Sequence, residues 1–379
     1  MALYLAVTVF ALTCAFFCSN GERVQLHIDG IPKAGRSRFG YIGRTRQQAL
    51  NLWIGIGIYL VLTAVSACRI AIGNDYWEYT EMFSLIAQER DVASEPGFNM
   101  LVRLVQYLAG PKKYFYLPIF GIIAAATVFF FLKAIFDQGE WFLGTLFLFM
   151  MNGYYFSSFN SVRYYLVLAI AAYSMRYVLR GEYGKFALWI LTAALFHKSV
   201  LVVLLLYPSA RWLAARKLNK WHVLAGVLMV LSLVFGRDFY RWIMFRFYPY
   251  YEGSAMDMVR YSVTNIGKCT GTLALSLICF RQTVQGSLRN KFYFYLNLGG
   301  LVLYTCAAYI PEVSRIGYYL VISQIFLIPN MLMHMPKGLW KKLLTAGTAV
   351  AFLLHFALFL RTAYDTDIRI LPYLNWIFN

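Results

Sequence analysis

The chain has 379 residues, of which 60% are hydrophobic and only 14% are charged, and its mean hydropathy is +0.57. So much apolar surface cannot be buried in a water-soluble globule of this size, so the composition excludes the classes of soluble enzymes and soluble binding proteins. The net charge of +18 is spread over the polar segments between apolar runs, which argues against a nucleic-acid partner and favours contacts with membrane lipids.

Apolar runs of about 20 residues, the length that spans a bilayer as a helix, recur along the whole chain. They predict an all-α, polytopic integral membrane protein with about twelve transmembrane or re-entrant helices. The first run, Met1–Phe17, is expected to be a retained helix, because it lacks the basic start and the clear cleavage site of a signal peptide.

An arginine-rich loop follows this first helix and ends at Arg46. The positive-inside rule places the loop in the cytoplasm. We therefore divide the chain into residues 1–48, an N-terminal helix with its basic loop, and residues 49–379, the main transmembrane domain.

The remaining helices follow in chain order from the apolar runs. Residues 69–113 are expected outside the cytoplasm, with an amphipathic interfacial helix at Phe98–Leu108. The predicted membrane helices after the first are Asn51–Cys68, Tyr114–Phe136, Trp141–Ser157, Val162–Leu179, Phe186–Tyr207, Val223–Phe239, Val263–Phe280, Phe292–Ile310, Ile316–Met335 and Leu343–Leu360. Both termini are then expected on the outer side of the membrane.

The run Phe186–Tyr207 is expected to turn back on itself. Basic residues flank it at both ends, and the charge rule places both of these flanks in the cytoplasm. Three polar residues, His197-Lys198-Ser199, interrupt its leucines. Two short or re-entrant helices are therefore predicted to meet there, near the outer face.

Polar residues inside or beside the apolar runs gather on the expected outer side. Ionisable groups at such depth are unstable unless they are paired or hydrated, so a shared water-filled cavity that opens outward is predicted. The residues concerned are Arg69, Asp75, Glu78, Arg163, His197, Lys198, Glu312 and Arg315.

Two arginines are the first candidates for holding a phosphate group. Arg163 opens one predicted helix and Arg315 lies between two others, so each guanidinium could bind a diphosphate through its bidentate fork. The alternative for Arg163 is a helix-end arginine that reaches the lipid interface, and for Arg315 it is an ion pair with Glu312. Arg69 and Lys198 are further candidates, and their alternative is a structural role.

His197 is the candidate base, since a neutral imidazole near pH 7 can take a proton from a sugar hydroxyl. The alternative is a buried histidine that is bound to a backbone carbonyl. Acidic and aromatic side chains alternate at Asp75, Tyr76 and Glu78, as in sugar-binding sites, although an interfacial aromatic belt produces the same pattern. Both interpretations also apply to Tyr318.

Sequence patterns for metal or nucleotide binding are absent. The chain has no glycine-rich phosphate loop, no His-x-x-x-His pair and no Asp-x-Asp motif, and its six cysteines lie in or beside apolar runs without the spacing of a zinc site. No metal and no cofactor are therefore expected. A lipid-linked donor suits this absence, because its diphosphate is already a good leaving group and needs only cations to hold it and a base for the acceptor.

Six short motifs occur in a specific order and spacing between residues 69 and 373. They are Gly73-Asn74-Asp75-Tyr76, Glu95-Pro96-Gly97-Phe98, Phe159-Asn160-Ser161-Val162-Arg163, Ala194-Leu195-Phe196-His197-Lys198-Ser199, Ser314-Arg315-Ile316-Gly317-Tyr318-Tyr319 and Leu371-Pro372-Tyr373. Together they resemble the EpsG family of Wzy-type polysaccharide polymerases. One departure is Tyr164, a position at which relatives often have glutamine.

The resemblance implies a glycosyltransferase at the outer face of the bacterial cytoplasmic membrane. Such an enzyme polymerises oligosaccharide repeat units carried on undecaprenyl diphosphate by moving the growing chain onto the non-reducing end of the next unit. Arg163, His197 and Arg315 are then the catalytic residues. Substrate contacts are expected from Arg69, Asp75, Tyr76, Glu78, Asn160, Lys198, Glu312 and Tyr318.

Partners and competing functions also follow from this interpretation. The expected partners are the lipid-linked oligosaccharide and membrane lipids, with a chain-length regulator and a flippase as candidates. A ligase that moves a finished glycan from the same lipid to another acceptor would need the same arginines and base. A lipid-linked glycan flippase or transporter would instead need charges along a path through both leaflets.

Overall fold

The computed structural model describes residues 1–18, 46–88, 90, 92, 94–110, 116–217, 220–254, 257–365 and 369–377. Every regular element in these ranges is a helix, and 17 of them are α-helices, so the all-α prediction is confirmed. Nearly all of the basic loop that we expect in the cytoplasm lies outside the described residues.

The helices follow one another with short connections along most of the chain. They are α1 (Ala2–Phe16), α2 (Arg46–Ala67), α3 (Asp75–Ala87), α4 (Pro96–Ala109), α5 (Tyr116–Gln138), α6 (Phe142–Met151), α7 (Tyr154–Ser157), α8 (Val162–Leu179), α9 (Tyr183–Ala194), α10 (Val203–Ala215), α11 (Lys220–Phe235), α12 (Arg237–Phe247), α13 (Val263–Ile278), α14 (Leu288–Cys306), α15 (Val313–Val321), α16 (Gln324–His334) and α17 (Leu339–Asp365). Shorter helical turns are η1 (Lys198–Val202), η2 (Pro249–Tyr251) and η3 (Phe280–Val284).

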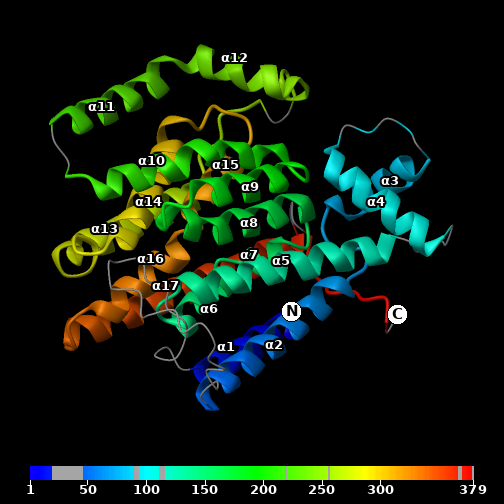
Figure 1. Ribbon diagram of the computed structural model, residues 1–379, viewed down its shortest axis with the longest axis horizontal. Helices are drawn as coiled ribbons and strands as arrows, with labels where there is room; N and C mark the ends of the chain where they lie inside the picture. Colours follow the sequence, from blue (N-terminus) through cyan, green and yellow to red (C-terminus); the bar gives the residue numbers. More distant parts are fainter. Residues whose placement is uncertain are drawn as a thin grey trace, which may run out of the picture.

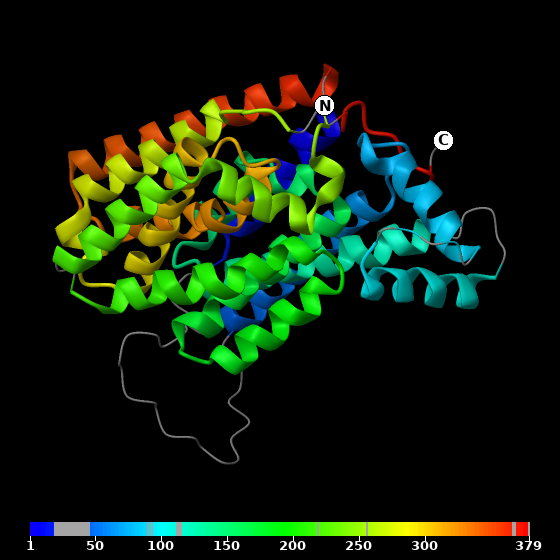
Figure 2. The ribbon, with the colours of Figure 1, turned by 90° about the horizontal axis from the view of Figure 1, so that it is seen from above.

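The long helices form one bundle around α8 (Figure 1). α5 packs on α2 and on α8, α8 packs on α9, and α14 packs on α10, α13 and α15. Nearly every residue of α8 is buried. α11 and α12 lie along one side of the bundle, and α3 and α4 project from one end of it (Figures 1 and 2).

Five helices of the described chain are long and apolar enough to cross a membrane, and the bent pair of α11 and α12 would make a sixth. The chain is thus a multi-pass integral membrane protein by the length and composition of its helices. The expected number of about twelve spans is not seen, because several predicted runs are short, broken or polar. The five spans are Ala49–Ala67, Tyr116–Gln138, Lys198–Ala215, Val313–His334 and Leu339–Tyr364.

Several of the predicted runs are divided in the structure, as three of them illustrate. The run Trp141–Ser157 breaks at Gly153, whose φ of +73° is a left-handed conformation that glycine adopts without strain. Beyond Phe235 the chain bends by 76° into α12, so the run Val223–Phe239 covers parts of two helices. The predicted break in the run Phe186–Tyr207 is confirmed, since α9 ends at Ala194 and η1 begins at Lys198.

α9 and α10 run in opposite directions across the bundle (Figure 1). Their junction at His197 therefore lies at the end of the bundle where α8 begins. Two helices were missed by the hydrophobic pattern, α3 and α12, because both are short and carry charged residues in their first turns. The helix expected at Phe98–Leu108 is α4, which has a strongly amphipathic pattern with Phe98, Val102 and Val105 on its buried side.

At the opposite end, six ionisable side chains form a set that we call the α5–α6 cluster. Asp137, near the end of α5, pairs with Lys133 and with Arg176 of α8. Glu140, just before α6, pairs with Arg289 of α14 and His334 of α16. The contacts of Asp137 join α5 to α8, and the contacts of Glu140 join α14 to α16.

The N-terminal helix α1 shares the main core of the protein. Its Tyr4 packs against Phe156 of α7, and the Tyr4 hydroxyl donates a hydrogen bond to the carbonyl oxygen of Ile370 at 2.6 Å. α1 also packs on α2 and α6. The division of the chain at residue 48 stays a prediction, although the first helix is not separate from the rest in space.

Candidate functional site

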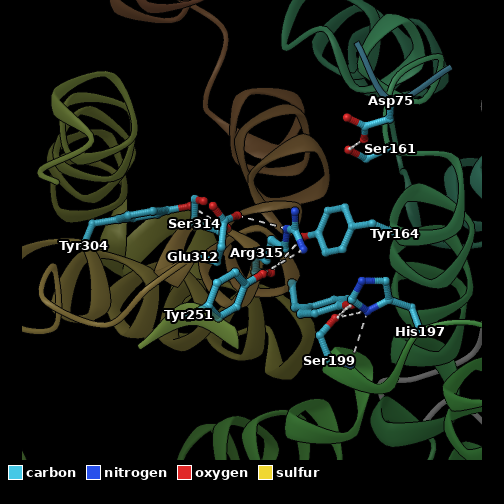
Figure 3. A network of polar contacts seen from close by, with 11 residues as sticks. Asp75, Ser161, Tyr164, His197, Ser199, Tyr251, Tyr304, Glu312, Ser314 and Arg315 are labelled. Atoms are coloured by element: carbon cyan, nitrogen blue, oxygen red, sulfur yellow. Dashed lines mark hydrogen bonds and ion pairs between the residues drawn. The ribbon is translucent and has the colours of Figure 1, made fainter. Parts of the chain in front are cut away.

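Five segments that are distant in sequence meet at the end of the bundle where α8 begins. They are the residue before α4, the start of α8, the α9–η1 junction, the segment from the end of α12 to η2, and the start of α15. Figure 3 shows several of their polar side chains turned toward one another. We call the set Glu95, Arg163, His197, Lys198, Glu312 and Arg315 the arginine site.

Arg163 is the second residue of α8, and its side chain is held on two sides. Its Nη1 atom lies 2.7 Å from Oε2 of Glu95, and only 15% of the Arg163 side chain is exposed. The guanidinium also lies over the rings of Phe98, at 4.9 Å, and Tyr79, at 5.7 Å. These contacts orient the charged group before any ligand arrives.

Glu95 joins α8 to the α9–η1 junction. While Oε2 accepts from Arg163, its Oε1 atom accepts a hydrogen bond from the backbone N–H of Lys198 at 3.1 Å. The Lys198 ammonium donates to the carbonyl oxygen of Phe247 at 3.1 Å and lies 4.3 Å from the centre of the Tyr248 ring. Within the described residues Lys198 has no carboxylate partner, so it adds an exposed, uncompensated positive charge.

The imidazole of His197 is bound on one edge. Its Nδ1 atom accepts from the backbone N–H of Ser199 at 3.3 Å and lies 2.9 Å from the Ser199 hydroxyl. That hydroxyl is 2.8 Å from the hydroxyl of Tyr319. Because Nδ1 accepts from a backbone N–H, the proton of the neutral ring resides on Nε2.

His197 is kept neutral by its surroundings. Burial lowers its pKa to about 3, and the positive charges of Arg315, Arg163 and Lys198 contribute in the same direction. The ring therefore carries no charge at neutral pH.

Arg315 lies in the first turn of α15 and is the more accessible arginine, with 37% of its side chain exposed. Its Nε atom lies 3.0 Å from Oε2 of Glu312, and its Nη1 atom donates to the Tyr251 hydroxyl at 3.4 Å (Figure 3). Glu312 has a φ of +54°, a left-handed conformation that costs a non-glycine residue about 1 kcal/mol and is concentrated at functional sites.

Tyr164 connects the three predicted catalytic residues. It follows Arg163 in the chain, and its hydroxyl donates to the backbone carbonyl of Arg315 at 2.7 Å. Its ring lies 5.9 Å from the ring of His197. The structure thus brings Arg163, His197 and Arg315 together, while their chemical roles stay predictions.

Asp75 and Asn160 contact each other rather than the arginines. The Asn160 side-chain oxygen accepts from the backbone N–H of Asp75 at 3.0 Å, and the Ser161 hydroxyl donates to Asp75 at 2.9 Å (Figure 3). A Cβ at Gly73 would lie 2.9 Å from Cα of Asn160, so this approach of α3 to α8 needs a glycine. The motif around residue 73 therefore has a packing role.

Arg69 and Tyr76 lie in the interior, each 1% exposed. Arg69 donates to the backbone of Ser66, and its guanidinium lies over the rings of Phe120 and Phe159. Tyr76 stacks on Phe120 at 4.9 Å. The expected substrate contacts of these two residues are not supported, because packing closes them off; the structural alternative fits Arg69.

Glu78 and Tyr318 are not among the side-chain partners of Arg163 and Arg315 in the described part of the chain. Glu78 is exposed on α3. The Tyr318 ring faces Tyr154 at 6.2 Å, and its hydroxyl is next to Asn265 of α13. Lys198 and Glu312, by contrast, lie in the arginine site. Their contacts with a substrate stay a prediction.

Sequence reasoning missed several polar side chains that complete the site. Glu95 belongs to the motif Glu95-Pro96-Gly97-Phe98 but was not predicted to be a site residue. An acidic residue directly before a proline that begins a helix could have indicated it. Tyr164 appeared only as a departure from the family. Tyr251, Ser199 and Tyr319 were not distinguishable from the many interfacial aromatic and polar residues.

The donor set of the site is cationic and hydroxylic. Among the residues that the structure describes, no three His, Cys, Asp or Glu side chains converge in a way that could hold a metal ion. Two guanidinium groups, one ammonium and one neutral imidazole are instead present, a set of groups that suits a polyanion next to a hydroxyl nucleophile.

Comparison with known proteins gives one match. The model of a family described as the EpsG family matches residues 52–375, which is most of the chain and includes every segment of the site. No curated protein matches the chain, and no solved structure does.

Proposed function

We propose, from the premise that this chain belongs to the EpsG family of membrane proteins linked to exopolysaccharide biosynthesis, that it is a polymerase of lipid-linked glycans. Its donor is a growing glycan on undecaprenyl diphosphate, and its acceptor is the next repeat unit on the same kind of lipid. The observation that carries the proposal is the meeting of Arg163, His197, Lys198 and Arg315 at the start of α8. Glu95 contacts Arg163 and Lys198 there, and Tyr164 contacts Arg315 and His197.

Arg163 and Arg315 hold the diphosphate of the donor in this proposal. Each is already oriented by a carboxylate, Glu95 or Glu312, so little side-chain entropy is lost when a phosphate oxygen joins or replaces that partner. Lys198 supplies charge that no carboxylate of the described chain neutralises. Such a set stabilises the negative charge that grows on the leaving group as the glycosidic bond breaks.

His197 and Ser199 serve the acceptor hydroxyl. The hydroxyl gives its proton to the Ser199 oxygen as Ser199 gives its own to Nδ1 of His197, a direction set by the hydrogen bonds seen at Nδ1. The acceptor oxygen bonds to C1 of the donor sugar, the bond from C1 to the diphosphate oxygen breaks, and polyprenyl diphosphate leaves with the electron pair. Bound diphosphate raises the pKa of His197 toward a range in which the ring accepts this proton.

We place the site at the outer face of a bacterial cytoplasmic membrane. The α9–α10 junction at His197 and the start of α8 lie at the same end of the bundle, opposite the basic segments that follow α8 and α10. The positive-inside rule orients such a bundle with the basic segments in the cytoplasm. Glu78 and Asn160 remain candidate sugar contacts, and a flippase and a chain-length regulator remain candidate partners.

The test is a reaction of the purified, reconstituted full chain with one defined undecaprenyl-diphosphate repeat unit. A ladder of longer lipid-linked glycans supports polymerisation. Transfer of the glycan only to an unrelated acceptor would instead identify a ligase, and movement across the bilayer without a new bond would identify a flippase. The matched variants are Arg315→Ala, which should lose the ladder, and Arg103→Ala on the exposed face of α4, which should keep it.

A further inference from the structure

A groove of about 500 Å³ runs between α13 and α17. Three glycines line it, Gly267 and Gly271 on α13 and Gly347 on α17, and a Cβ added to any of them would meet nothing within 4 Å. Gly267 and Gly271 are four residues apart and thus share one face of α13. The groove is therefore open along two neighbouring helices, with walls that are mainly small and apolar.

Two basic side chains lie in this apolar groove. Lys268 comes from α13 and His355 from α17, and they are close enough for the charge of Lys268 to act on His355. The Lys268 ammonium is 3.3 Å from the side-chain oxygen of Asn152, so it points to the end of α6 in the bundle. No carboxylate of the described residues lines the groove.

A lysine ammonium among apolar side chains is unfavourable unless an anion lies nearby. An amide oxygen satisfies one of the three ammonium donors but brings no negative charge. The groove therefore complements a ligand with an apolar chain and an anionic group, which is the chemistry of a phosphate-bearing lipid.

The groove is connected to the arginine site through two helices. Asn265 lies one turn before Lys268 on α13 and is next to the hydroxyl of Tyr318 of α15. Tyr318 in turn lies one turn after Arg315. A diphosphate at Lys268 would thus lie beside the site without occupying it.

We propose that this groove binds the isoprenoid diphosphate of the acceptor repeat unit, with the chain between α13 and α17 and the diphosphate at Lys268. The inference rests on the proposed function, in which two lipid-linked units are bound at once. The acceptor reacts at the end of its glycan farthest from its own lipid, so its diphosphate cannot share the arginines with the donor. It needs a second cationic position and a second path for its lipid chain.

The experiment counts bound lipids by native mass spectrometry of the detergent-purified full chain with undecaprenyl diphosphate as the probe. The wild-type chain should bind two. Lys268→Met should bind one lipid tightly. Its affinity for the second lipid should be at least about tenfold lower than that of the wild type, because a charge-assisted contact is lost. Gly271→Leu should give the same loss by filling the groove. Gly57→Leu is the matched control. A Cβ at Gly57 also meets nothing within 4 Å, but Gly57 lies on α2, which does not line the groove.

The outcomes separate this inference from the proposed function. Two lipids retained by both Lys268→Met and Gly271→Leu would overturn the groove assignment, and so would equal displacement of the second lipid by phosphatidylglycerol. Loss of one lipid in Arg163→Ala with Arg315→Ala, and of the other in Lys268→Met, supports both assignments. If the double arginine variant keeps two lipids while Lys268→Met keeps one, the groove stands and the donor site is wrong.

Discussion

Charged side chains gather at both ends of the helix bundle, and the two groups use their carboxylates differently. In the α5–α6 cluster each carboxylate has two side-chain partners, as Asp137 does with Lys133 and Arg176. In the arginine site each carboxylate pairs with one side-chain cation. Lys198 there has only a backbone carbonyl and an aromatic ring in the described part of the chain.

The difference separates a structural group from a binding group. Arg176 and Arg289 are 15% and 10% exposed, so their ion pairs are enclosed between helices. Arg163 of the arginine site is enclosed to the same degree, at 15%. Arg315 is 37% exposed, and its carboxylate partner Glu312 lies only three residues away in the chain. An arginine in such a local, exposed ion pair can exchange its carboxylate partner for a phosphate with little effect on helix packing.

Loss of either arginine of the site should have the largest effect on activity. Arg163→Ala or Arg315→Ala should lower the rate of ladder formation by about 10²- to 10³-fold, the cost of removing a group that stabilises transition-state charge. Thermal unfolding of Arg315→Ala should be nearly unchanged, since its pair is local. Unchanged product lengths and rates in both variants would exclude the proposal that these two arginines hold the donor diphosphate.

Substitution of His197 should have the second-largest effect on activity. His197→Asn should lower kcat by about 10²-fold, the lower range for removal of a general base, with little change in KM for the donor. Ser199→Ala should have a smaller effect of the same kind, because water can replace the hydroxyl. A change in KM alone would show that His197 only binds the substrate.

The opposite pattern is expected in the α5–α6 cluster. Arg176→Ala leaves Asp137 with Lys133 alone in an enclosed position, which should reduce stability by about 3 kcal/mol. Thermal unfolding monitored in detergent would show the loss, and the rate per folded molecule should stay within a few-fold of the wild type. Normal stability with abolished activity would contradict the division into a structural and a binding group.

The charge on His197 offers a test that does not depend on activity. Because its pKa is lowered to about 3, mainly by burial, the ring should stay neutral from pH 8 down to about pH 4. Lys198→Met removes one of the cations and should raise the pKa, though not to the ordinary value. Titration of ¹³C-labelled histidines by NMR, with His197→Asn for assignment, measures this. Titration of the wild-type ring near pH 6.5 would be inconsistent with the enclosed site.

The smallest expected effect is at Tyr251. Tyr251→Phe removes a long hydrogen bond to Arg315 but leaves the ring and the Glu312 pair in place. Ladder formation should slow by about 2- to 10-fold, because a hydrogen bond of 3.4 Å is weak even when its donor is charged. A larger loss would assign the Tyr251 hydroxyl a direct contact with substrate.

The sequence alone determined the class of protein, most helices and the catalytic candidates. Apolar runs near bilayer length reflect a local requirement, because backbone groups in lipid must be satisfied within each helix. For the same reason the polar break at His197-Lys198-Ser199 was readable from the pattern, as was α8, whose predicted bounds Val162–Leu179 are those observed. The short motifs pointed to Arg163, His197 and Arg315.

Only the tertiary structure decided which polar residues meet. Arg69 and Arg163 look alike in sequence, each at a helix end on the same side, yet one is enclosed by aromatic rings and the other reaches the site. The contacts of Glu95 with Arg163 and Lys198 span 68 and 103 positions of the chain, which no local pattern encodes. Depth, burial and the choice of partner arise from how helices pack, because these properties depend on neighbours that are far away in the chain.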